Sequence, residues 1–172
     1  MSHFTVLVVG EDVEAQLKPF DENGAKVKAK NAKWDWWTIG GRWSKQLVTV
    51  EGLECDTSLV GELDRDAMKA KQRKHAAEAW AAAEKEKTSA GVRELIYGIE
   101  RGMTREQYLD ASEAFTTFAV LKDGKWYERG KMGWWACVVS NEKAADKWQA
   151  EFNKLLESLP PETRITVVDC HI

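Results

Sequence analysis

The sequence HFTVLVV, residues 3–9, is short, apolar and rich in β-branched side chains. This composition predicts a strand that is buried on both faces. A second stretch of the same kind, RITVVDCH at residues 164–171, lies near the other end of the sequence. The fold therefore depends on how these two strands are placed in a sheet.

The segments between them predict an α+β protein. Further strands are expected at residues 43–50, 116–121, 125–128 and 133–139, and helices at residues 11–20, 61–87, 92–100, 105–114 and 141–159. The outer elements follow the order of a ferredoxin-like (split βαβ) antiparallel sheet. A single domain over residues 1–172 is expected, with a large helical insertion over about residues 54–114. The alternative is a five- to six-stranded α+β meander sheet.

The ferredoxin-like order has a local consequence. In it the first and last strands are antiparallel neighbours, so His3 is expected close to Asp169 and His171. These residues could form a metal site or an acid–base pair. The alternative is a set of hydrogen-bonded structural histidines. His3-Phe4-Thr5 also fits the HxT pattern of two-histidine phosphoesterases, but those enzymes need a second HxT, which this sequence lacks.

Composition excludes several classes of protein. The 172 residues are 44% hydrophobic and 31% charged, with a net charge of -3, which argues against general nucleic-acid binding and a basic membrane-surface protein. No apolar stretch is long enough to span a membrane, and the first residues lack a signal-peptide pattern. The three cysteines are widely spaced and form no CxxC pair. A cytoplasmic protein without a cofactor is expected.

The segment at residues 61–87 has a different composition, with eight alanines and thirteen charged residues. It predicts a long helix with a thin apolar stripe. The helix is expected either to be solvated along one face or to form a binding arm for nucleic acid or another partner. The basic residues of such an arm would be Lys69, Lys71, Arg73 and Lys74.

The motif WDWWTIGGRW, residues 34–43, is the most informative segment. Consecutive tryptophans in a strand point to opposite faces. A glycine pair lets a ligand approach the backbone closely, and Arg42 offers a planar fork for phosphate. A nucleotide could then stack its base on an indole while backbone N–H groups and Arg42 take its phosphate. The candidate ligand-binding residues here are Trp36, Trp37, Gly40, Gly41, Arg42 and Trp43.

The alternative interpretation of this motif is structural. The tryptophans would fill the core at a corner of the fold, and Arg42 would pair with Asp35 or another carboxylate. No P-loop or GxGxxG pattern favours one interpretation over the other.

A second aromatic cluster follows at residues 126–135. An aromatic floor edged by basic side chains suits an anionic ligand, whereas the alternative is sheet core with solvated loop charges. The candidates in this cluster are Trp126, Arg129, Lys131 and Trp135.

Both ends of the sequence resemble a group of small bacterial and bacteriophage-encoded proteins. The resemblance rests on residues 2–9, 34–43, 124–128, 131–135 and 166–172, and residues 54–113 carry little of it. It implies a phage or prophage origin. It implies no activity and no catalytic residue.

Together these patterns predict a small binding protein with a Trp- and Arg-lined pocket for a nucleotide-like or other phosphorylated small molecule. One alternative is a module that binds a host or phage protein through exposed tryptophans and the long charged helix at residues 61–87. Another is a metal-dependent hydrolase or phosphoesterase that uses His3, Asp169 and His171. No pattern in the sequence requires an enzyme.

Overall fold

The first and last predicted strands pair antiparallel along their length. In the computed structural model, β1 (His3–Val9) lies against β10 (Arg164–His171), with His3 opposite His171 and Val9 opposite Ile165. The structure describes residues 3–24, 27, 31–85, 102–132, 138–140 and 143–172. Most side chains of both strands are buried, as their apolar sequences predict. The predicted pairing of these strands is therefore confirmed.

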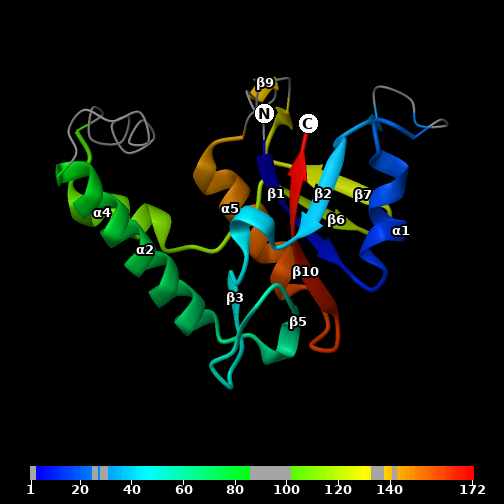
Figure 1. The fold of residues 1–172 in the computed structure, drawn as a ribbon. Coiled ribbons are helices and arrows are strands. Elements are labelled where there is room, and N and C mark those ends of the chain that lie inside the picture. The colour runs from blue at the N-terminus through cyan, green and yellow to red at the C-terminus, as the bar shows by residue number, and fades with distance from the viewer. Residues whose placement is uncertain (1–2, 25–26, 28–30, 86–101, 133–137, 141–142) are drawn as a thin grey trace. The chain divides into compact units, whose positions relative to one another are not determined.

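β1 lies at the centre of a six-stranded mixed sheet (Figure 1). Besides β1 and β10, the sheet contains β2 (Trp36–Ile39), β5 (Thr57–Leu59), β6 (Ala119–Lys122) and β7 (Lys125–Glu128). The order is β2-β10-β1-β6-β7, and β5 pairs with the start of β10. The β1–β6 pair is parallel, while the other pairs in the sheet are antiparallel.

The α+β class is confirmed, but this one parallel pair departs from an antiparallel ferredoxin-like order. In that order the second strand of the central hairpin would lie beside β1. Here the first strand, β6, takes this place. Three of the four β6 residues are buried, whereas β7 alternates between exposed and half-buried residues. The more apolar strand of the hairpin thus occupies the interior of the sheet, and the more polar one forms its edge.

Two helices cover opposite faces of the sheet (Figure 1). On one face, α1 (Val13–Leu17) and the 3-10 turn η1 (Lys18–Phe20) pack on a core that includes Phe4, Val6 and Leu121. On the other face, α5 (Ala145–Glu157) buries Trp148, Phe152 and Leu156. The Trp148 indole N–H donates a hydrogen bond to the Thr117 carbonyl at 2.7 Å.

The shorter elements are η3 (Gly41–Trp43), β3 (Leu47–Val48), β4 (Glu54–Cys55), η4 (Val60–Glu62), β8 (Lys131–Met132) and β9 (Val138–Ser140). The predicted strand at residues 43–50 is wrong beyond the two residues of β3. Within this range Lys45 has a φ value of 63°, which an extended strand does not accommodate. Trp43 belongs to the 3-10 turn η3, so the backbone turns before β3 begins.

Other predicted boundaries shift. The helix expected at residues 11–20 is limited to α1 and η1, because Pro19 lies at the beginning of the 3-10 turn. The strand expected from residue 116 begins at Ala119, and α5 begins after Ala144 rather than Asn141. The helix expected at 92–100, residues 133–137 of the expected 133–139 strand, and Asn141 lie outside the described residues.

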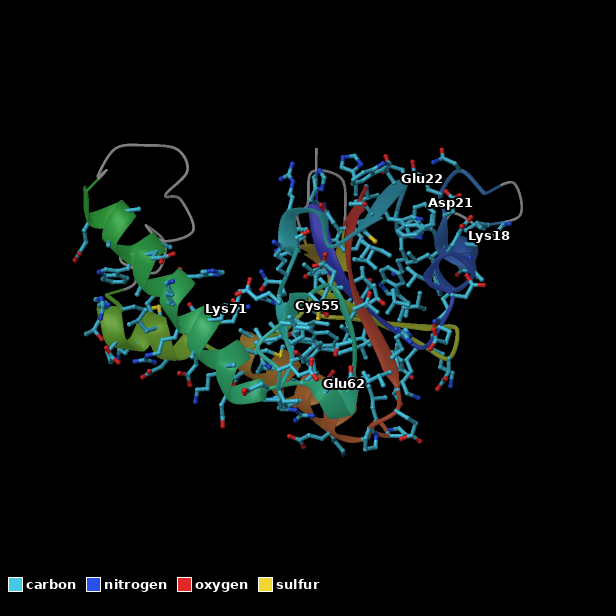
Figure 2. The ribbon with its side chains drawn as sticks, turned by 60° about the horizontal axis from the view of Figure 1, so that its bottom comes forward. Lys18, Asp21, Glu22, Cys55, Glu62 and Lys71 are labelled. Atoms are coloured by element: carbon cyan, nitrogen blue, oxygen red, sulfur yellow. The ribbon has the colours of Figure 1, made fainter. Side chains whose placement is uncertain are left out.

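The segment that leads into β2 is anchored at the end of α1. Lys18, Asp21 and Glu22 lie together there (Figure 2), and the Glu22 amide donates to the Trp34 carbonyl at 2.8 Å. The buried Trp34 indole donates to the Leu17 carbonyl at 3.1 Å. These contacts fix the residue two positions before β2, and thereby the start of the site described below.

Residues 65–115 form a separate compact unit, while residues 54–64 belong with the sheet. This unit contains α2 (Arg65–Lys85) and α4 (Arg105–Ser112). A capping box begins α4: the Thr104 hydroxyl accepts from the Gln107 amide, and the Gln107 side chain accepts from the Thr104 amide. None of the helices in the described part of the chain has the length and apolar character that a membrane span requires.

Ion pairs join α2 to α4. Arg73 contacts Asp110 at 2.6 Å, Glu113 at 3.1 Å and also Glu106, and Lys69 contacts Glu113 at 2.8 Å. Lys74 also lies 4.0 Å from Glu78, so three of the four basic residues considered for a binding arm have carboxylate partners within their own unit. The hydrogen bond from Lys69, followed by its charge, lowers the pKa of Glu113 below its ordinary value.

This lowered pKa predicts a pH-dependent contribution of Glu113 to stability. The ionised carboxylate stabilises the fold above its ordinary pKa of 4.5, and the contribution is lost as the pH falls through the lower pKa of the folded state. Glu113→Gln should lower the melting temperature at pH 7, and this difference should disappear in more acidic solution. Glu78→Gln is the control, since the ion pair of Glu78 in the described part of the chain is a 4.0 Å contact with the exposed Lys74. A difference that persists at acid pH would contradict the assignment.

Candidate functional site

The β1–β10 pairing brings two histidines into contact. His3 and His171 are direct register partners, and their ring centroids lie 5.1 Å apart with an interplanar angle of 68°. Directly paired residues of neighbouring strands point to the same face of a sheet. The prediction that the topology brings His3 close to Asp169 and His171 is therefore confirmed.

Asp169 holds the first of these rings. Its side chain is buried, and one carboxylate oxygen lies 2.8 Å from the His3 Nδ1 atom. The other oxygen accepts a hydrogen bond of 3.0 Å from the Arg42 backbone amide. A buried carboxylate is costly without partners, and here both oxygens have one. Asp169 thus joins β1, β10 and the turn that follows β2.

Asp35 holds the second ring. Its carboxylate lies 2.6 Å from the His171 Nδ1 atom, and its backbone amide donates to the His171 carbonyl at 2.9 Å. The other ring nitrogen, His171 Nε2, is buried and has no hydrogen-bond partner among the described residues. The Asp35–His171 contact was not predicted. It depends on the register of β2 against β10, in which His171 lies opposite Trp36.

The two carboxylates determine what the imidazoles can do. An ionised carboxylate only accepts hydrogen bonds, so each neutral ring must carry its proton on Nδ1. The Nε2 atom of each ring is then unprotonated and has a free lone pair. An imidazole oriented in this way can accept a proton or bind a metal ion. The two histidines can therefore take part in proton transfer or metal binding as well as stabilise the fold.

The glycine pair has a structural explanation. Gly40 and Gly41 have φ values of 67° and 55°, and a Cβ atom on Gly41 would lie 2.5 Å from the Asp169 carboxylate. A Cβ atom on Gly40 would lie 2.4 Å from an Asp56 oxygen. The close approach that these glycines permit is thus to carboxylates of the protein itself.

The prediction that backbone N–H groups of this turn bind phosphate is wrong for two of them. The Gly40 amide donates to the Val167 carbonyl at 2.9 Å, and the Arg42 amide donates to Asp169. These two donors are therefore not available to a phosphate, whereas the Arg42 side chain is exposed.

Alternation along β2 separates the two tryptophans, as predicted. Trp36 is 49% exposed, and its ring centroid lies 6.0 Å from that of His3. Trp37 is half-buried and packs against the core on the α1 side of the sheet. Trp43 is half-buried in η3. Of the three, only Trp36 contacts the histidine pair.

Trp126, from the second aromatic cluster, lies on the other edge of the sheet. It is in β7, its ring packs against Phe4 and Phe20, and its indole N–H donates to Glu128 at 2.9 Å. Because β2 and β7 form opposite edges, Trp36 and Trp126 do not line one pocket. The Trp126 contacts agree with a role in the core. Arg129 is half-buried, only the backbone of Lys131 is described, and Trp135 lies outside the described residues.

A pocket beside α5 and the buried Cys170 thiol are not part of the candidate site. A pocket of about 320 Å³ between α5 and the β6–β7 hairpin is lined by Tyr127, Trp148 and Phe152, among others, and contains none of the predicted site residues. Cys170 is fully buried, and this burial raises the pKa of its thiol far above the ordinary value. It packs as a small apolar side chain, and Cys137 lies outside the described residues.

Comparisons of the chain with models of protein families, with curated proteins and with solved structures yield no match. The function must therefore be argued from the geometry of the site alone.

The Gly41–Asp169 contact predicts a difference between two glycine substitutions. Gly41 and Gly52 both have positive φ values, of 55° and 79°, but a Cβ atom on Gly52 would have no neighbour within 4 Å. Gly52→Ala should cost about 1–2 kcal/mol of unfolding free energy, from backbone strain alone. Gly41→Ala should cost about 1–3 kcal/mol more, because it displaces Asp169 from its partners. Equal losses of unfolding free energy in the two variants, measured by denaturant unfolding, would show that the Gly41–Asp169 contact does not contribute to stability.

Proposed function

We propose that the protein is a cytoplasmic binding protein for a phosphorylated aromatic small molecule of nucleotide-like chemistry. The proposed site is the face of the sheet formed by the paired ends of β2, β10 and β1. The observation that carries the proposal is the half-exposed Trp36 ring in contact with His3, which itself contacts His171.

Each part of this surface suits one part of such a ligand. An exposed indole face can stack on a base, a contact worth about 1–3 kcal/mol. The exposed Arg42 guanidinium lies on the turn that Asp169 holds, and it can form two hydrogen bonds with a phosphate. His3 offers a third polar contact, and its side chain is held in place by Asp169.

A protein partner is the second candidate, supported by a different observation. β2 is an edge strand, and it exposes both Trp36 and Ile39, the latter to 47%. These two side chains point to opposite faces because they are three residues apart in a strand. A small ligand beside the histidines would not reach Ile39, whereas a partner that adds a strand to this edge would contact both.

Calorimetric titration with nucleoside mono-, di- and triphosphates, in the presence of EDTA, tests the first candidate. Trp36→Ala should weaken binding roughly 5- to 150-fold with little change in melting temperature. Arg42→Lys should weaken it roughly ten- to a hundredfold, because an ammonium group lacks the planar fork. An unphosphorylated nucleoside should bind more weakly than its monophosphate.

Two matched variants serve as controls. Tyr127→Ala removes an aromatic side chain that is 41% exposed on the opposite edge strand, and it should leave binding unchanged. Ile39→Ala should also have no effect on a small ligand. Absence of binding by all the nucleotides would refute the proposal, as would equal losses in Trp36→Ala and Tyr127→Ala.

A further inference from the structure

The distance between the two histidine rings is the distance expected for two imidazoles that bind one metal ion. In a tetrahedral zinc site each imidazole nitrogen lies about 2.0–2.1 Å from the metal, which places the centroids of two bound rings about 5 Å apart. The His3 and His171 centroids are separated by 5.1 Å, and their planes are inclined by 68°. An edge-to-face contact of two unliganded rings has a similar separation, so the surroundings of the rings must distinguish the two cases.

The first distinguishing feature is the carboxylate partner of each ring. Asp169 contacts His3 Nδ1 at 2.8 Å, and Asp35 contacts His171 Nδ1 at 2.6 Å. Metal-binding histidines characteristically donate their second N–H to a carboxylate or carbonyl, which fixes the tautomer and raises the basicity of the ligating nitrogen. One such contact is common in proteins, but here two adjacent rings both have it.

The second feature is the unsatisfied His171 Nε2 atom. It is buried without a hydrogen-bond partner among the described residues. A buried polar atom without a partner costs about 1–3 kcal/mol. A metal ion bound to this lone pair would remove that cost.

From these observations we propose that His3 and His171 bind a divalent transition metal ion through their Nε2 atoms. Imidazole ligands favour zinc, nickel, cobalt or copper over magnesium and calcium. Within the part of the chain that the structure describes, no group of three or more His, Cys, Asp and Glu side chains is arranged to hold a metal ion. A metal ion held by these two imidazoles alone would take its remaining ligands from water or from oxygen atoms of an anionic ligand.

This inference does not require the ligand proposed above, although the two sites adjoin. A phosphate group placed beside Trp36 could supply oxygen ligands to the metal. The experiment below contains no nucleotide, so metal binding and nucleotide binding succeed or fail separately.

Titration of the metal-free full-length chain with Co²⁺, followed by visible absorption, and with Zn²⁺, followed by calorimetry, tests the proposal. One equivalent of each metal should bind, with cobalt bands of a site containing nitrogen ligands. His3→Ala and His171→Ala should each weaken binding at least about tenfold. His75→Ala is the matched control, because His75 is exposed on α2 in the other unit, and it should bind as the wild type does.

Asp35→Asn keeps the test decisive if His171→Ala fails to fold. It retains both histidines and removes only the carboxylate that orients His171, so it should weaken binding about 10- to 100-fold. Absence of binding by the wild type would overturn the proposal. So would an equal loss in His75→Ala, or unchanged affinity in folded His3→Ala and Asp35→Asn. Metal binding without nucleotide binding would retain this site and refute only the proposed function.

Discussion

The arrangement of this sheet and of its candidate site depends on one buried carboxylate. Asp169 is 1% exposed, and its two oxygens are occupied by the His3 ring and by the Arg42 amide. Hydrogen bonds to a charged group contribute about 1.5–3 kcal/mol each, and loss of either partner would leave a buried charge poorly compensated. The position of the Asp169 carboxylate explains why Gly41 cannot carry a side chain. Its hydrogen bond to the Arg42 amide fixes the turn after β2 against β1 and β10.

Carboxylate partners also determine which nitrogen atoms of the site are free to react. Strand pairing alone would place His3 beside His171, but the carboxylates of Asp169 and Asp35 determine which nitrogen of each ring remains free. Both free nitrogens belong to adjacent rings, and the exposed indole of Trp36 contacts one of these rings. With Nε2 unprotonated the two rings can bind a metal ion, and an imidazole that becomes protonated there can instead donate to an anionic ligand. Neither possibility requires a movement of the backbone.

Local signals in the sequence predicted more of this fold than long-range ones. The apolar runs at residues 3–9 and 164–171 identify strands, because each signal lies within its own segment. The parallel β1–β6 pair could not be read in this way, since it depends on which strand of the hairpin is more apolar. The glycine pair indicated a close approach without indicating to what. The structural alternative considered Asp35 or another carboxylate as a partner for Arg42. The Asp35–His171 contact could not be read from the sequence, because the register that forms it joins residues far apart in the chain.

The most direct test of the account is the protonation pattern of the histidine rings, measured by ¹⁵N chemical shifts of their side chains at a pH where the rings are neutral. We expect His3 and His171 to carry their protons on Nδ1, with Nε2 unprotonated, because a carboxylate partner accepts from Nδ1 in each case. His75, which is exposed on α2, provides a reference within the same spectrum. Protons on Nε2 of His3 and His171 would contradict the account, since neither ring could then donate to its aspartate or bind a metal through that nitrogen.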